Sequence, residues 1–126
     1  MNDVDKPVVG IIDDDPAVRD SLISLVECGG YAAVAFSSAE QFLQRGSLPE
    51  AVFLIVDVRL PGMSGVELLD RLASAGLAKP AAVITGHADS EELRQAPHLS
   101  GVRVFTKPAD PGALLQVIAA AAGPAT

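Results

Sequence analysis

Short apolar runs alternate with longer amphipathic stretches along this chain. Each run has four to six residues and is rich in Val, Ile or Phe, as is typical of a strand that is buried on both faces of a sheet. The pattern therefore predicts five strands, at residues 8–12, 32–36, 51–56, 81–84 and 102–105.

The stretches between these runs carry the signals of helix starts. Asp15 and Asp110 each stand directly before a proline, which is favoured at the first position of a helix. Ser64 is followed three residues later by Glu67, which is the spacing of a capping box. We expect five helices, capped by Asp15, Ser37 or Ser38, Ser64, Asp89 and Asp110.

Five strands that alternate with five helices predict an α/β fold of the (βα)5 type. Short connections and right-handed crossovers place such strands in one doubly wound parallel sheet, with helices on both faces. The chain has 126 residues, which is the length of one domain. We expect its core over residues 8–122, and a tail or the start of a linker at 123–126.

Composition and charge exclude several classes of protein. Apolar residues make up 49% of the chain and charged residues 20%, which excludes wholesale disorder. The net charge of −7 does not fit direct binding of nucleic acid. No apolar run approaches the roughly 18 residues of a membrane span, and the single cysteine, Cys28, excludes an internal disulfide. We therefore expect a cytoplasmic domain that contacts neither membrane nor nucleic acid directly.

Reactive side chains stand at the ends of four predicted strands. Asp13 and Asp14 follow the first strand, Asp57 the third, Thr85 the fourth and Lys107 the fifth. The carboxyl ends of parallel strands meet at one edge of a sheet, so we expect these side chains to share a cleft. Crowded carboxylates favour a hard divalent cation, and Mg²⁺ suits them because it also accepts phosphate oxygens. A carboxylate beside a metal and a lysine can attack phosphorus to give an aspartyl phosphate.

Taken alone, each of these residues has an ordinary structural explanation. Asp13 and Asp14 could form a solvated turn, and Asp57 could cap a helix. Thr85 could be a turn hydroxyl, and Lys107 a surface charge. Their combination at one edge of the sheet is what favours a functional site.

The segments that contain these residues resemble a response-regulator receiver domain. Residues 57–69 and 84–87 are similar to the FixJ-type subgroup, whose receivers usually precede a helix-turn-helix DNA-binding domain. The resemblance implies a sheet with the flavodoxin-like strand order 2-1-3-4-5. The segments that carry it are residues 12–15, residue 57 with 60–65, residues 84–86 and residues 107–108.

The resemblance implies a phosphoacceptor and a metal site. Asp57 would accept the phosphoryl group. Asp14 and Asp57 would bind Mg²⁺ directly, together with the backbone carbonyl of Arg59, whereas Asp13 would act through a water molecule.

The resemblance also implies how a phosphoryl group is held and sensed. Lys107 would bind the phosphoryl oxygens. The peptide bond between Lys107 and Pro108 would be cis, a form that is readily accessible only before proline. Thr85 would be the switch hydroxyl. We expect Arg59 and His87 to gate access to the site.

Several positions depart from the family's pattern. Val104 stands three residues before Lys107, where receivers usually carry Tyr or Phe, and Ala109 replaces a common Phe. Pro97 interrupts the predicted fourth helix. These changes lie on the face formed by the fourth helix, fifth strand and fifth helix, which is the family's usual output and dimerisation surface. We expect intact phosphorylation chemistry, with the switch carried mainly by residues 85–89.

The leading interpretation is a module that takes a phosphoryl group from a histidine kinase onto Asp57. It would then regulate an output domain or a partner protein, or form a homodimer. It would catalyse only its own phosphotransfer and autodephosphorylation, so it is not expected to be an ordinary enzyme. The alternative is a degenerate receiver that docks proteins without phosphorylation. A phosphatase of the haloacid-dehalogenase type, which places its nucleophile and acid as Asp-x-Asp after the first strand, is disfavoured because that class also needs a lid, for which this chain has no spare length.

Overall fold

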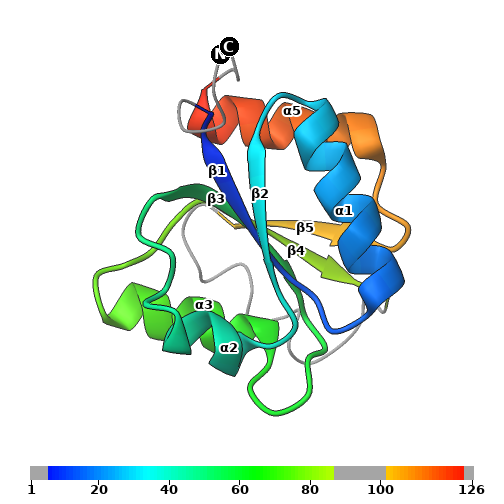
Figure 1. The fold of residues 1–126 in the computed structure, drawn as a ribbon. Helices are drawn as coiled ribbons and strands as arrows, with labels where there is room; N and C mark the ends of the chain where they lie inside the picture. Colours follow the sequence, from blue (N-terminus) through cyan, green and yellow to red (C-terminus); the bar gives the residue numbers. More distant parts are fainter. Residues whose placement is uncertain (1–5, 87–101, 124–126) are drawn as a thin grey trace.

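A computed structural model describes residues 6–86 and 102–123 of the chain (Figure 1). The predicted fourth helix, with its cap at Asp89 and its break at Pro97, lies outside the described residues, as does His87. The described elements are β1 (Val8–Ile12), α1 (Pro16–Cys28), β2 (Ala32–Phe36), α2 (Ala39–Gln44), β3 (Ala51–Asp57), α3 (Gly65–Ser74), β4 (Ala81–Thr85), β5 (Val102–Thr106) and α5 (Pro111–Ala122).

The strands form one parallel sheet in the order β2-β1-β3-β4-β5. This arrangement confirms the predicted (βα)5 fold and its strand order 2-1-3-4-5. The register places Ile12 beside both Phe36 and Val56, and Asp57 beside Ile84, so the carboxyl ends of the central strands are level. The direction of winding reverses between β1 and β3, which is where open α/β sheets bind ligands.

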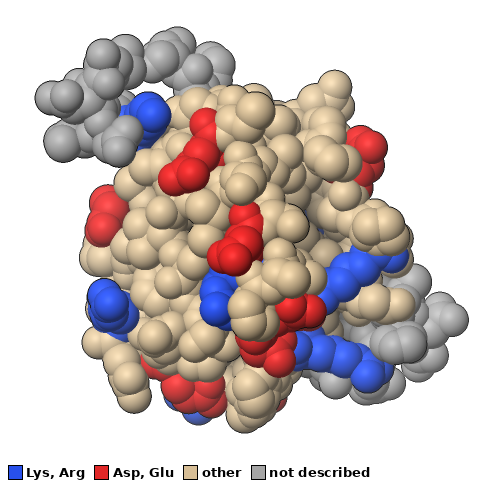
Figure 2. Space-filling model, turned by 45° about the vertical axis from the view of Figure 1, so that its right-hand side comes forward, with Lys and Arg blue, Asp and Glu red and all other residues tan. Residues whose placement is uncertain are grey.

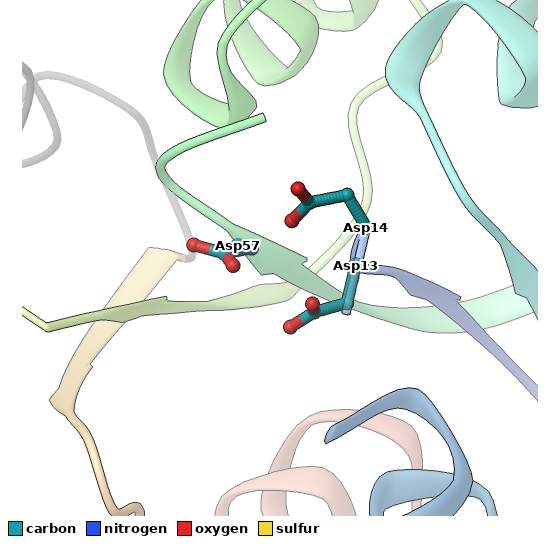
Figure 3. Close-up of side chains that lie close together, drawn as sticks. All are labelled: Asp13, Asp14 and Asp57. Atoms are coloured by element: carbon teal, nitrogen blue, oxygen red, sulfur yellow. The ribbon is translucent and has the colours of Figure 1, made fainter. Parts of the chain in front are cut away.

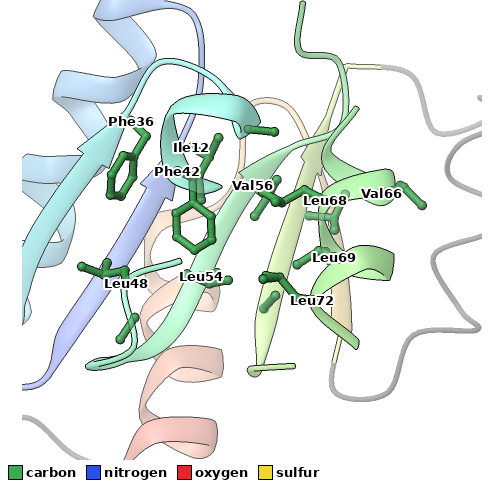
Figure 4. Close-up of a cluster of buried hydrophobic side chains, with 14 of the residues drawn as sticks. Ile12, Phe36, Phe42, Leu48, Leu54, Val56, Val66, Leu68, Leu69 and Leu72 are labelled. Atoms are coloured by element: carbon green, nitrogen blue, oxygen red, sulfur yellow. The ribbon is translucent and has the colours of Figure 1, made fainter. Parts of the chain in front are cut away.

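Helices cover both faces of the sheet. Figure 1 shows α1 and α5 on one face and α2 and α3 on the other. Successive residues of β3 point to opposite faces, and both sets are buried because each face is covered. Phe53 and Ile55 join the core beneath α1 and α5, whereas Leu54 and Val56 join the core beneath α2 and α3. Figure 4 shows the core beneath α2 and α3, in which Phe42 of α2 is fully buried.

Strand β5 departs from the prediction that every strand is buried on both faces. It lies at an edge of the sheet, where it pairs with β4, and its residues are only partly buried or exposed. Strand β2 lies at the other edge, and all of its residues except Phe36 are likewise only partly buried. The side chain of Val104 is 41% exposed, whereas Phe105 packs against the core beneath α1 and α5. An apolar run alone therefore did not distinguish an edge strand from a central one.

The predicted capping residues begin four of the described helices. Asp15 accepts hydrogen bonds from the backbone N–H groups of Ala17 and Val18, and Asp110 accepts one from Ala113. Of the two candidates at the start of α2, Ser38 is the cap. Ser64 caps α3 in the same way. Each cap satisfies a donor that the first turn of a helix otherwise leaves unpaired.

The described parts of the chain also bear on the membrane prediction. Within residues 6–86 and 102–123, no helix is long and apolar enough to span a bilayer.

Candidate functional site

Three carboxylates converge at the carboxyl edge of the sheet. Asp13 and Asp14 follow β1, and Asp57 is the last residue of the neighbouring strand β3. One carboxylate oxygen of each lies within 4.8 Å of the other two (Figure 3). The sheet therefore brings together residues that are more than forty positions apart in the sequence.

Two of these three crowded carboxylates are buried, which disfavours their charged form. Asp13 is 1% exposed and Asp57 is 6% exposed, while Asp14 faces solvent. The pKa of Asp13 is raised to about 6, chiefly by burial and also by the charges of Asp57 and Asp14, against the lowering effect of the Asp15 N–H bond and of Lys107. A bound cation would stabilise the ionised form, so the donor set fits a divalent metal with oxygen ligands.

Lys107 supplies positive charge to the same cleft. Its Nζ donates a hydrogen bond of 2.9 Å to Oδ2 of Asp57 and lies 4.0 Å from Oδ2 of Asp13. Partial burial alone lowers the pKa of Lys107, but the hydrogen bond to Asp57 and the nearby carboxylate charges outweigh it and raise that pKa above its usual value. Lys107 is therefore held in its charged form beside Asp57.

The backbone at Lys107 is tied to the neighbouring strand. The N–H of Lys107 donates to the carbonyl of Thr85 at 2.7 Å, which ties the end of β5 to the end of β4. The Lys107–Pro108 peptide bond is cis.

The loop that follows Asp57 also donates a hydrogen bond to its carboxylate. Its Oδ1 accepts a hydrogen bond of 3.0 Å from the backbone N–H of Arg59, so each carboxylate oxygen has one donor. A carboxylate offers about four lone-pair sites, so both oxygens keep acceptor capacity. Arg59 is exposed, and its role in gating the site stays a prediction.

Asp13 is positioned by contacts that sequence reasoning did not identify. The guanidinium of Arg19 on α1 donates a hydrogen bond of 2.8 Å to the backbone carbonyl of Asp13. The N–H of Asp13 donates to the carbonyl of Phe36, and its Oδ1 accepts from the N–H of Asp15. The sequence did offer one signal for this contact: Arg19 stands six residues after Asp13, in a helix whose cap, Asp15, was predicted.

Two further predicted residues lie on β4 and β5. Thr85 is the last residue of β4 and is fully buried at the edge that carries the carboxylates. Its strand partner on β5 is Thr106. Val104 lies two residues earlier on β5, with its side chain exposed rather than packed beneath the site.

The charges of the surface are mixed in sign. Figure 2 shows acidic and basic side chains close to one another among uncharged surface. No broad basic patch covers the visible part of the described surface in that view, so this face does not resemble a nucleic-acid-binding surface.

Known proteins with similar sequences are bacterial regulators. A family model described as the response regulator receiver domain matches residues 9–119. The chain is 38% identical to the transcriptional regulatory protein FixJ of Azorhizobium caulinodans over 115 residues, which are 91% of this chain and 54% of that protein. It is 40% identical to the response regulator protein TmoT of Ectopseudomonas mendocina, over 86% of this chain and 49% of that protein. The chain spans about half the length of these curated relatives.

Solved structures agree with the sequence comparison. The crystal structure of FixJ-N has a TM-score of 0.82 and 34% identity, covering 97% of this chain and 95% of that one. The response regulator StyR has a TM-score of 0.83 and 34% identity, covering 93% of this chain and 59% of that one. With the family model matching most of its length, the chain belongs to the response-regulator receiver domains of two-component signalling.

Proposed function

We propose that Asp57 accepts a phosphoryl group from a histidine kinase in a reaction that depends on Mg²⁺. The observation that carries this proposal is the setting of Asp57. Its carboxylate is nearly buried, receives a hydrogen bond from the Lys107 ammonium, and lies beside two further carboxylates. Such a site holds an oxygen nucleophile next to groups that stabilise the charge of a transferring phosphoryl group.

The transfer is a substitution at phosphorus. An oxygen of the Asp57 carboxylate donates an electron pair to the phosphorus of a phosphohistidine, and the P–N bond breaks as the P–O bond forms. The imidazole leaves with the electron pair of that bond and takes up a proton from solvent. Lys107 moves its hydrogen bond from the carboxylate to a phosphoryl oxygen, where its charge opposes the charge that develops there.

The residues present fit a magnesium ion. Asp14 and Asp57 would hold it directly with the backbone carbonyl of Arg59, and Asp13 would hold it through water. Bound there, the ion would neutralise charge on the carboxylates and on the phosphoryl oxygens. The N–H of Arg59 and the ammonium of Lys107 orient the carboxylate of Asp57.

Labelling with acetyl phosphate tests the proposal. Intact-mass measurement should show one phosphoryl adduct on the wild-type chain with Mg²⁺, and none when EDTA replaces the metal. The adduct should disappear in Asp57→Asn and persist in Asp70→Asn, a matched control at an exposed position on α3. No adduct on the wild-type chain, under conditions that label other receivers, would favour the docking function without phosphorylation.

We further propose that Thr85 senses the phosphoryl group. Its hydroxyl would turn towards the phosphoryl oxygens and draw residues 85–89 with it. The exposed Val104 is too small to fill the space that an aromatic residue fills in other receivers. The change would therefore be carried mainly by the segment after Thr85.

The relatives suggest which domains or proteins respond to phosphorylation of this domain. The matched stretch makes up only about half of each of these regulators, and FixJ is named a transcriptional regulatory protein. We propose that an output domain or a separate partner reads the phosphorylation state in the cytoplasm. A homodimer through β5, α5 and the predicted fourth helix is one form this readout would take.

A further inference from the structure

The loop that carries Arg59 is closed at its base. This loop, residues 58–64, joins β3 to α3. The N–H of Val58 donates to the carbonyl of Ile84, and the N–H of Gly65 donates to the carbonyl of Val58, each at 3.0 Å. These two bonds fix where the loop leaves β3 and where it enters α3, and the N–H of Arg59 is held by Oδ1 of Asp57, but none of these bonds reaches residues 60–63.

A side chain from another element holds the far end of this loop. Oε2 of Glu40, in the first turn of α2, accepts a hydrogen bond of 2.9 Å from the backbone N–H of Met63. That bond, then the N–H of Glu40 itself and the charge of Arg71, hold the pKa of Glu40 below its usual value, so the carboxylate is ionised at neutral pH. Glu40 and Met63 are 23 positions apart, so this contact is tertiary rather than a local turn.

The loop is shaped to lie against this carboxylate. Gly62 has a φ of 77°, in the left-handed region that favours glycine. A Cβ at Gly62 would lie 2.5 Å from Oε2 of Glu40, so any side chain there would displace the carboxylate. Leu60 and Met63 pack against the core beneath α2 and α3, which presses the same loop onto the same helices.

We propose that Glu40 is a positioning residue for the magnesium site. Arg59 lies between the closed base at Val58 and the bond at Met63, so the direction of its carbonyl depends on both anchors. Without Glu40, the Met63 N–H turns to water, the loop gains conformations, and the direction of the Arg59 carbonyl is less narrowly fixed. This inference rests on the proposed function, since it assigns that carbonyl to Mg²⁺.

Three variants separate this role from a simple change of charge. Glu40→Ala removes the acceptor, and Glu40→Gln keeps an amide oxygen that can still accept from Met63. Glu67→Ala is the matched control, because Glu67 is likewise an exposed carboxylate in the first turn of the adjacent helix α3. The Mg²⁺ dissociation constant of each is measured by titration of backbone amide NMR signals, with the melting temperature recorded without metal.

Glu40→Ala should weaken Mg²⁺ binding about tenfold, as is found when a group that orients a metal ligand is removed. Glu40→Gln should recover most of this affinity, and Glu67→Ala should bind like the wild type. Equal Mg²⁺ affinity in Glu40→Ala and Glu67→Ala would overturn the role of Glu40. Labelling by acetyl phosphate is measured on the same samples. If the wild type is not labelled, the proposed function is refuted. The role of Glu40 is decided separately, by the ratio of the Mg²⁺ affinities.

Discussion

Gly65 is the point at which α3 touches the strand of the proposed phosphoacceptor. An ideal Cβ at this position would overlap the carbonyl oxygen of Asp57 and lie 2.8 Å from Cγ1 of Val56. Real Cβ atoms essentially never approach within 3.0 Å of another heavy atom. Because the obstructing carbonyl belongs to the backbone, Gly65→Ala must displace either the start of α3 or the end of β3.

The cost follows from two opposing effects. Overpacking costs about 1–3 kcal/mol, whereas alanine in place of glycine in a helix gains up to about 1 kcal/mol. Since backbone cannot rotate away as a side-chain tip does, we expect the upper part of this range, a net loss of about 2 kcal/mol in the free energy of unfolding. For a domain of this size, the melting temperature falls by roughly 6–10 °C. A shift on the order of 1 Å at a reacting group slows its chemistry about a hundredfold, so labelling of Asp57 should slow far more than the loss of stability explains.

Gly112→Ala is the matched control. Gly112 is the second residue of α5, and the nearest atom to its Cβ would be Oδ2 of Asp110 at 3.6 Å, an ordinary contact. This variant should be at least as stable as the wild type and be labelled at the same rate. Urea unfolding and the rate of acetyl phosphate labelling measure both effects. If Gly65→Ala matched Gly112→Ala in both, the close approach of α3 to Asp57 would not matter to either property.

Two further predictions concern Asp13 and Thr85. Without Mg²⁺, the pKa of Asp13 is about 6 in the folded state against a usual 3.8, so the stability linked to its protonation is complete below pH 3.8 and is lost as pH rises through 6. The free energy of unfolding of the wild type, minus that of Asp13→Asn, should fall by on the order of 3 kcal/mol between pH 4 and pH 7, and parallel urea-unfolding profiles would contradict this. Thr85→Ala should leave Asp57 labelled but abolish the backbone NMR shifts that beryllofluoride induces after residue 85. Equal shifts in variant and wild type would exclude Thr85 as the sensor.

Most of the fold followed from the chain's own pattern, because buried parallel strands are apolar on both faces. The run at residues 51–56 predicted β3 almost to its end, and Asp15 and Ser64 marked helix starts by the donors they satisfy. The prediction that each strand is buried on both faces was wrong at the two edge strands, β5 and, to a lesser degree, β2. Edge position depends on which strands pair, and Val102 and Val104 are as apolar as residues of a central strand.

The site was less predictable where it depends on contacts between elements. Asp13, Asp57 and Lys107 were found together because each ends a strand, and topology alone brings strand ends to one edge. Glu40 carried no such signal. Its contact with Met63 requires the docking of α2 beside the loop, which is not visible before the chain is folded.

The ion pair between Lys107 and Asp57 joins positions 50 residues apart, and its lysine follows the last strand of the sheet. During synthesis, the acidic residues leave the ribosome well before this lysine. A copy folded only as far as β4 holds crowded carboxylates without the ammonium group that answers them. Under the proposed function, such a copy is a poor acceptor. Under the same proposal, the ability to accept a phosphoryl group arrives only with the final strand.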